Sequence, residues 1–144
     1  MPCRVPLKKV AKKSSRMAGR VLLDTNVIIV FFSGEKGVSK QFADAEVFVS
    51  STVLGELYYG ARKSAHAAAN LARIEQFAAS VEVLSCDAAT AQIYGKLRDQ
   101  LRSKGRPIPE NDIWIAAVAL QHALTLATRD EHFNEVDGLH IENW

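Results

Sequence analysis

VLLDTN, at residues 21–26, is the stretch that decides the fold of this chain. Three apolar residues run directly into an acid, a hydroxyl and an amide. A short, continuous apolar run is typical of a strand that is buried on both faces, as in a parallel sheet. Asp24 would then lie at the carboxyl end of this strand, where open α/β sheets bind their ligands. The alternative is that Asp24, Thr25 and Asn26 form only a turn or a helix cap.

The rest of the chain alternates between short apolar runs and longer helical patterns. Further strands are predicted at 47–49, 81–84 and 124–127, with a short edge strand at 139–141. Apolar spacing predicts helices at 27–32, 38–45, 53–61, 65–79, 88–103 and 113–122, the last of them buried nearly all round. This alternation predicts an α/β fold, a three-layer α/β/α sandwich with a mostly parallel sheet.

Length and composition indicate one ordinary globular domain, which we assign to residues 20–144. The full chain of 144 residues has 48% hydrophobic and 24% charged residues, which match a globular protein that functions in water. Cys3 and Cys86 share no motif, so neither a disulfide framework nor a metal knuckle is expected, and a reducing compartment such as the cytoplasm is favoured. No apolar run approaches the ~20 residues of a membrane helix. Glycine-rich phosphate loops are also missing, which argues against dinucleotide and P-loop functions.

The first 19 residues form a basic extension. Seven Lys and Arg and no acid fall in residues 1–20, leaving 11 basic and 16 acidic residues in 21–144, a net charge of −5 for the body. Such an arm can attract nucleic acid, or it can be a disordered extension without a role. Its basic, Ser-containing composition is also compatible with a transit peptide. Met17, just before the first predicted strand, is a second candidate start.

Four acids stand at similar boundaries between apolar and polar sequence. Asp24 and Asp130 follow predicted strands, whereas Glu56 and Asp112 lie near the starts of helices. Taken singly, acids in first turns are explained by the helix dipole. In a parallel sheet, however, strand carboxyl ends and the following helix amino ends share one rim, so all four can meet there. Four close carboxylates repel one another unless a cation intervenes.

An all-oxygen ligand set without Cys or His favours Mg²⁺ or Mn²⁺ over Zn²⁺. Such ions activate water and stabilise charge at phosphorus, so the predicted chemistry is phosphodiester hydrolysis. No Ser/His/Asp or Cys/His set is present. His122, in a predicted core helix, and His132, in a loop, are expected to be packing or capping residues rather than bases.

Two other classes of function remain open from the residues alone. One is a non-catalytic RNA-binding or scaffold domain on the same fold, which would not need four acids. The other is an Asp-based phosphotransfer protein, either a receiver or a phosphatase. The phosphatase pattern requires a second acid where Asn26 stands, and a receiver requires a lysine where Arg129 stands. Metal-dependent phosphodiester hydrolysis is the prediction that uses all four acids.

Around these acids the chain resembles the PIN-domain nucleases, and more narrowly the VapC toxins of toxin–antitoxin pairs. The resemblance covers about residues 20–144 and rests on four short motifs in the right order: LLDTN at 22–26, ELYYG at 56–60, NDIWIAA at 111–117 and TRDEHF at 128–133. It implies an α/β/α sandwich with Mg²⁺- or Mn²⁺-dependent endoribonuclease activity on structured RNA such as tRNA. It also implies homodimers and inhibition by a VapB-like antitoxin.

The resemblance also implies a role for each matching residue. Asp24 and Asp112 match the principal metal ligands. Glu56 matches an acid that binds metal or orients water, and Asp130 a fourth acid that acts directly or through water. The supporting polar positions are Thr25, Asn26, Ser51, Asn111 and Thr128.

An acidic body that binds RNA needs local cations as well as metal. The candidates are Arg62, Lys63, Arg98, Arg102, Lys104, Arg106 and Arg129. Of the large aromatic residues, we expect most to pack in the core, and some to form a dimer face or a groove for an antitoxin helix. The aromatic residues in question are Phe42, Tyr58, Tyr59 and Trp114. An antitoxin could also silence the site by placing an Arg or Lys among the carboxylates.

Overall fold

The computed structural model describes residues 19–144, so the basic extension predicted for residues 1–19 lies outside the described part apart from its last residue. A single sheet of five strands runs through this part. Its strands are β1 (Arg20–Leu23), β2 (Glu46–Ser50), β3 (Glu82–Leu84), β4 (Thr125–Ala127) and β5 (Ile141–Glu142). The order is β3-β2-β1-β4-β5 and every pairing is parallel. The predicted parallel sheet is therefore confirmed.

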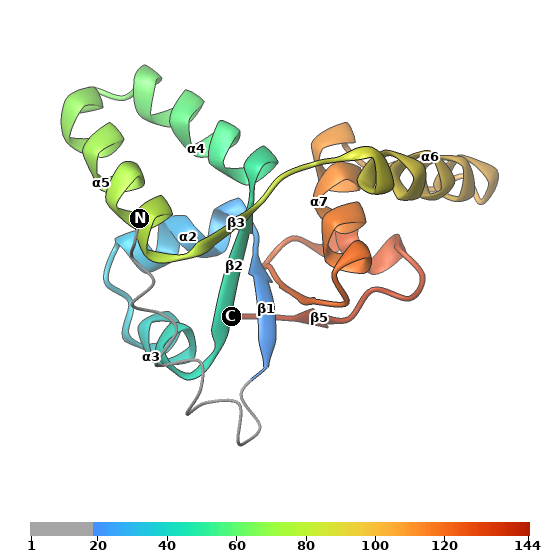
Figure 1. Ribbon diagram of the computed structural model, residues 1–144, viewed down its shortest axis with the longest axis horizontal. Coiled ribbons are helices and arrows are strands. Elements are labelled where there is room, and N and C mark those ends of the chain that lie inside the picture. The colour runs from blue at the N-terminus through green and yellow to red at the C-terminus, as the bar shows by residue number, and fades with distance from the viewer. Residues whose placement is uncertain (1–18) are drawn as a thin grey trace.

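Helices cover both faces of the sheet, which confirms the three-layer sandwich. Figure 1 shows α2 to α5 on one side and α6 and α7 on the other. The helices are α2 (Thr25–Phe32), α3 (Lys36–Asp44), α4 (Ser51–Lys63), α5 (Ala67–Ser80), α6 (Ala88–Ser103), α7 (Glu110–Gln121) and the short 3-10 helix η1 (Glu131–Glu135). Among residues 19–144, none of these helices is long and apolar enough to cross a membrane.

The core is built where strands and helices are covered on all sides. Leu22 and Leu23 of β1 are fully buried because β1 lies between β2 and β4. In α7 the stretch Ile115–Ala119 is fully buried, whereas Trp114 and Leu120 are only half-buried, so the expectation of burial nearly all round was too strong. Trp114 instead stacks on Tyr94 of α6, with ring centroids 4.0 Å apart.

Most predicted elements differ from the observed ones by one to three residues at an end, and the edge strand and the first helix are two examples. The edge strand was predicted at 139–141 but is Ile141–Glu142, because only these residues pair in register with β4. The first helix begins at Thr25 rather than at residue 27, and of the three polar residues at 24–26 it is Asp24 that caps it. The Asp24 backbone is extended and its carboxylate accepts the Thr25 N–H, as an N-cap requires.

The strand order determines which edge of the sheet can bind a ligand. From β1 the chain moves outward through β2 to β3, and then returns to the opposite side of β1 for β4 and β5. The carboxyl ends of β1 and β4 are thus neighbours at the point where the winding direction reverses, with Leu23 opposite Ala127. In open α/β sheets this switch point is where ligands bind.

Candidate active site

Asp24 lies at the switch point and ties its two strands together. Its backbone N–H donates to the Ala127 carbonyl at 3.0 Å. Its Oδ1 accepts the Thr25 N–H at 2.8 Å, and its Oδ2 accepts the Thr128 hydroxyl at 2.7 Å. The Thr128 hydroxyl also accepts the Asp130 N–H at 3.0 Å. Asp24 is only 5% exposed, so it is both a helix cap and a buried carboxylate facing the site.

Glu56 reaches the same edge from the second turn of α4. The Thr25 hydroxyl donates to its Oε1 at 2.5 Å, and the Asn111 side-chain amide donates to its Oε2 at 3.1 Å. The carboxylate is therefore held from both sides, by α2 and by α7. Asn111 opens the helix that also carries Asp112, so the position of Glu56 is coupled to that of the next acid.

Asp112 and Asp130 meet at the imidazole of His132. The His132 Nδ1 lies 3.3 Å from Asp112 Oδ2 and 3.1 Å from Asp130 Oδ1. One ligand atom from each residue lies within 4.8 Å of the other two, a spacing that a metal ion can bridge. Asp112 is largely covered, with a side-chain exposure of 13%, whereas the His132 side chain is 53% exposed. His132 was predicted to be a packing or capping residue rather than a base; its exposed ring, which faces two acids, is not a packing residue.

The electrostatics of the site are those of crowded carboxylates. Burial raises the pKa of Asp24 above its ordinary value, and the charges of Glu56 and Asp130 raise it further, against hydrogen bonds that lower it. Burial also raises the pKa of Asp112 to about 6, with added repulsion from Asp24 and Asp130 and an opposing contribution from His132. These shifts link all four acids in one field, as convergence at one rim requires.

The donor set fits a hard divalent cation. Carboxylate oxygens from several elements converge, and burial together with the charges of neighbouring acids raises the pKa values of Asp24 and Asp112. One imidazole, from His132, joins this otherwise all-oxygen set. Oxygen-rich sets suit Mg²⁺ and Mn²⁺, and an imidazole is compatible with Mn²⁺. Among the described residues, the ligand atoms close enough to share one ion come from Asp112, Asp130 and His132, and the charge of Asp24 interacts with both of these acids.

Of the five predicted supporting residues, four lie in this network and Ser51 does not. Thr25 and Asn111 hold Glu56, Thr128 holds Asp24, and Asn26 Oδ1 accepts the N–H of Arg129 at 3.3 Å. Ser51 is exposed and, in residues 19–144, its hydroxyl forms no hydrogen bond to the acids. The fully buried neighbour Ser50 is instead the α4 N-cap, accepting the Val53 N–H at 3.2 Å.

Ser50 and Ser51 provide a matched pair for testing this assignment. Ser50→Ala removes the cap and leaves a buried N–H of Val53 unpaired, so we expect a loss of about 1 kcal/mol in the free energy of unfolding. Ser51→Ala is expected to change it by less than about 0.5 kcal/mol. Urea denaturation of both variants measures the difference. Equal losses would show that the cap is misassigned.

Arg129 is held away from the role of a phosphotransfer cation. Its guanidinium donates to the Trp144 carbonyl at 2.6 Å and to Glu35 at 3.1 Å. Together with the bond from its N–H to Asn26, these contacts fix the loop that carries Thr128 and Asp130. The receiver hypothesis therefore lacks a free cation at residue 129, and the phosphatase hypothesis lacks its second acid because residue 26 is Asn.

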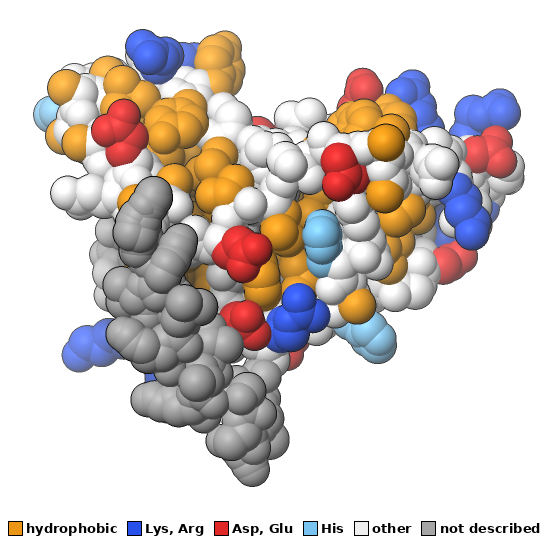
Figure 2. Space-filling model, viewed as in Figure 1, with side chains coloured by type: hydrophobic (Ala, Val, Ile, Leu, Met, Phe, Trp, Pro, Cys, Tyr) orange, Lys and Arg blue, Asp and Glu red, His pale blue; other side chains and the backbone are white. Residues whose placement is uncertain are grey.

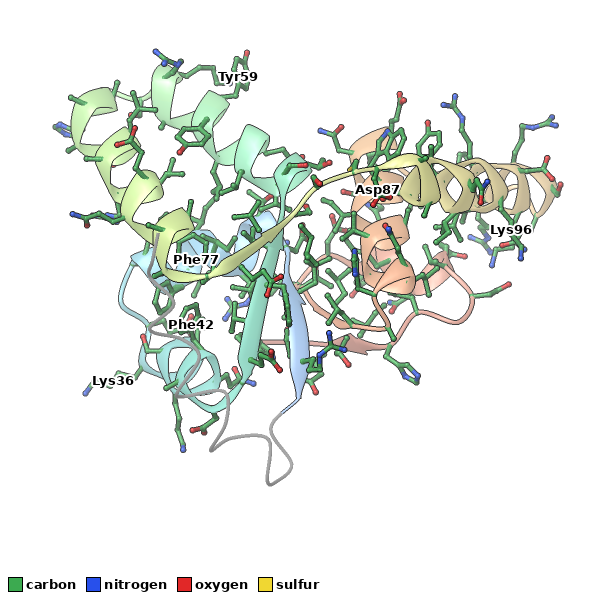
Figure 3. All side chains as sticks on the ribbon, viewed as in Figure 1. Lys36, Phe42, Tyr59, Phe77, Asp87 and Lys96 are labelled. Atoms are coloured by element: carbon green, nitrogen blue, oxygen red, sulfur yellow. The ribbon has the colours of Figure 1, made fainter. Side chains whose placement is uncertain are left out.

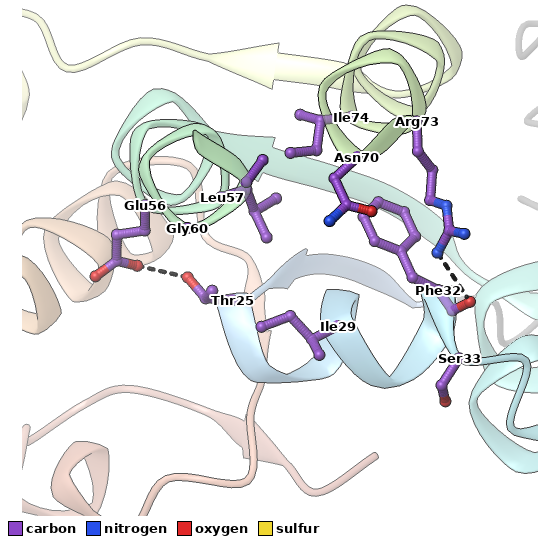
Figure 4. Close-up of a pocket in the computed structure, with 11 residues that line it drawn as sticks. Thr25, Ile29, Phe32, Ser33, Glu56, Leu57, Gly60, Asn70, Arg73 and Ile74 are labelled. Atoms are coloured by element: carbon purple, nitrogen blue, oxygen red, sulfur yellow. Dashed lines mark hydrogen bonds between the residues drawn. The ribbon is translucent and has the colours of Figure 1, made fainter. Parts of the chain in front are cut away.

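A cavity of about 340 Å³ opens beside the acids between α2, α4 and α5. Thr25 and Glu56 form one end of it, and Asn70 and Arg73 the other (Figure 4). Its walls are mostly apolar, and they include Ile29, whose side chain is 56% exposed. The edge of the sheet that carries the acids is thus continuous with an apolar groove.

Comparisons with known proteins agree with this geometry. Residues 21–139 match the family model of the PIN domain. The tRNA(fMet)-specific endonuclease VapC of Shigella flexneri is 36% identical over 87% of this chain and 98% of that protein. Ribonuclease VapC5 of Mycobacterium tuberculosis is 35% identical over 81% and 87% of the two chains. The toxin-fold chain in the crystal structure of DNA-bound VapBC from Salmonella typhimurium has a TM-score of 0.82 at 33% identity, covering 89% and 99%.

These matches extend over the whole acid-bearing fold. The VapBC complex from Rickettsia felis, bound to a promoter DNA fragment, gives a TM-score of 0.80 at 29% identity over 86% of this chain. The identity to these relatives agrees with the parallel five-stranded sheet and with the four acids at its switch point. The chain belongs to the PIN-domain family and, within it, to the VapC ribonucleases.

Proposed function

We propose that the protein is a divalent-metal-dependent endoribonuclease and the toxin of a toxin–antitoxin pair, acting on structured cellular RNA in the cytoplasm. The observation that carries this proposal is the convergence of Asp24, Glu56, Asp112 and Asp130, with the pKa of two of them raised by burial and mutual repulsion. A bound cation would relieve the repulsion between these carboxylates. The tRNA endonuclease name of the Shigella relative makes tRNA the first substrate to test.

Each side chain has a role in this proposal. Asp24 and Asp112 would bind Mg²⁺ or Mn²⁺, with Asp130 and His132 completing the set. When bound, the ion would lower the pKa of a water and neutralise charge at the scissile phosphate. Glu56, fixed by Thr25 and Asn111, would orient the attacking water and accept its proton. Thr128 keeps the Asp24 carboxylate turned toward the site.

The experiment is cleavage of a tRNA pool by the purified protein. We expect cleavage with Mg²⁺ or Mn²⁺, none with excess EDTA, and recovery when the metal is restored. Mapping the product ends tests whether cuts are internal. Cleavage that persists in EDTA would contradict metal dependence. Cleavage that is equal in wild type and in an Asp24→Asn variant would reveal a contaminating nuclease.

The partner in this proposal is a VapB-like antitoxin that occupies the apolar groove. A short amphipathic segment would place apolar side chains against Ile29 and Leu57, and a cationic side chain could then reach Glu56 at the end of the groove. A complex in which the inhibitor approaches neither this groove nor Asp24 and Asp112 would contradict this arrangement. We also propose a homodimer, which sedimentation analysis of the free toxin tests.

A further inference from the structure

One exposed stripe of α4 leads directly away from the catalytic edge. Glu56, Tyr59 and Lys63 follow one another at spacings of three and four residues, so they lie on one side of the helix. Tyr59 is 65% exposed, although large aromatic side chains are usually covered. Figure 3 shows it near the end of α4 that lies away from the sheet.

The end of this stripe is a pair of cations without carboxylate partners. Five of the seven predicted RNA-contacting cations form ion pairs of 4.0 Å or less; they are Arg98, Arg102, Lys104, Arg106 and Arg129. Within residues 19–144, Arg62 and Lys63 form none, and both are exposed in the last turn of α4. Figure 2 shows basic and hydrophobic side chains adjacent at this end of the helix. Of the predicted cations, these two are therefore free to meet phosphates.

The aromatic ring already holds a positive group against it. The Lys63 Nζ lies 4.7 Å from the centroid of the Tyr59 ring, which is a cation–π contact. The ring is thus accessible to a flat or charged group. A cationic track combined with an aromatic ring is the means by which proteins hold single-stranded nucleic acid.

We propose that Glu56, Tyr59 and Lys63 form a track for the RNA strand that leaves the cleavage site, an inference that rests on the proposed nuclease function. At 1.5 Å per residue, Tyr59 lies about 4.5 Å and Lys63 about 10.5 Å along the axis from Glu56. A stacked strand advances about 3.4 Å per nucleotide. Tyr59 would stack on a base next to the scissile phosphate, and Lys63 would bind a phosphate about three nucleotides away.

An RNA strand fits this stripe better than a protein surface does. A protein interface needs a contiguous apolar centre. Here a single ring stands between a carboxylate and a cation, while the apolar side chains of α4, such as Leu57 and Ala61, are buried on its other side. A base that stacks on Tyr59 would displace the Lys63 ammonium, which would then pair with a phosphate.

Binding of a short fluorescein-labelled single-stranded RNA to the Asp112→Asn protein in EDTA tests this track separately from catalysis. We expect Tyr59→Ala to weaken binding roughly five- to tenfold and Tyr59→Phe to retain it, because the ring rather than the hydroxyl is used. Lys63→Ala should also reduce the slope of log affinity against log salt by about 0.7, the value for one phosphate contact on a single strand. Lys40→Ala, which removes an exposed lysine of α3 that is paired with Asp44, is the control.

Several results would overturn the track. The first is an RNA affinity that Tyr59→Ala leaves unchanged. The second is a slope of log affinity against log salt that Lys63→Ala and Lys40→Ala change equally. The third is that the Asp112→Asn protein does not bind RNA. A change of sedimentation in Tyr59→Ala with intact RNA binding would assign the stripe to a second copy of the chain. Wild-type protein that cleaves RNA while Tyr59→Ala binds it normally would refute the track and leave the proposed function standing.

Discussion

Asp112→Asn and Asp24→Asn are each expected to lower kcat/KM for RNA cleavage by on the order of 10³ or more. A bound metal ion contributes several kcal/mol to stabilising charge in the transition state, and about 1.4 kcal/mol corresponds to a factor of ten. An amide keeps the size of the side chain but removes the charge that holds the ion. Initial rates on a tRNA substrate at saturating Mn²⁺ measure the loss.

Asp99→Asn is the matched control for this result. Asp99 is an exposed acid of α6 that pairs with Arg102 at 3.8 Å, and its substitution should leave kcat/KM unchanged. Thr128→Val removes the hydroxyl donor to Asp24, and we expect it to lower kcat/KM by about 10- to 100-fold, less than Asp24→Asn but more than Asp99→Asn. Full activity in Asp112→Asn at any metal concentration would refute the assigned site.

Asp112→Asn should also stabilise the metal-free protein at neutral pH. The Asp112 pKa rises from 3.8 to about 6 in the folded state because its charged form is buried beside other acids. A carboxyl with a raised pKa binds its proton more tightly when folded, so stability falls as pH increases from about 4 to 6 and stays lower above that range. The rise corresponds to on the order of 3 kcal/mol. Replacing the acid by a neutral amide removes this cost.

Urea denaturation in EDTA from pH 4 to 8 measures this effect as the difference between wild type and variant. The two should converge near pH 4, where the carboxyl is protonated, and diverge above pH 6. Added Mn²⁺ should stabilise the wild type far more than the variant, because the ion binds the folded site. Asp99→Asn should follow the wild type at every pH. An Asp112→Asn protein that is less stable than wild type at pH 7 in EDTA would contradict the raised pKa of Asp112.

The sequence was sufficient to predict the parallel sheet and the convergence of the four acids at one edge of it. Apolar runs that end in a carboxylate, as at Asp24 and Asp130, predict strands whose carboxyl ends share a rim, and the parallel topology then brings Glu56 and Asp112 to it. This works because a buried strand and its abrupt polar end are both local signals. Burial at this edge, with the charges of the neighbouring acids added to it, raises the pKa values of Asp24 and Asp112.

Details set by side-chain direction were beyond the sequence. His132 was interpreted as a packing or capping residue because a lone loop histidine carries no local signal, and only the turn of η1 directs its Nδ1 at two acids. Ser51 was predicted as a supporting residue because its position in the sequence matches the family motif, but its exposed side chain lies outside the network of the acids. A motif position does not define the direction of a side chain. Likewise, composition could not tell which cations are already paired.

Under the proposed mechanism, the groove beside the acids would provide a second place at which activity can be inhibited. Glu56 and its donor Thr25 both line that groove, on helices α4 and α2. A molecule wedged between these helices would separate the hydroxyl from the carboxylate and misdirect the attacking water while leaving the cation ligands in place. Such an inhibitor would act without chelation, and no excess of magnesium or manganese would reverse it.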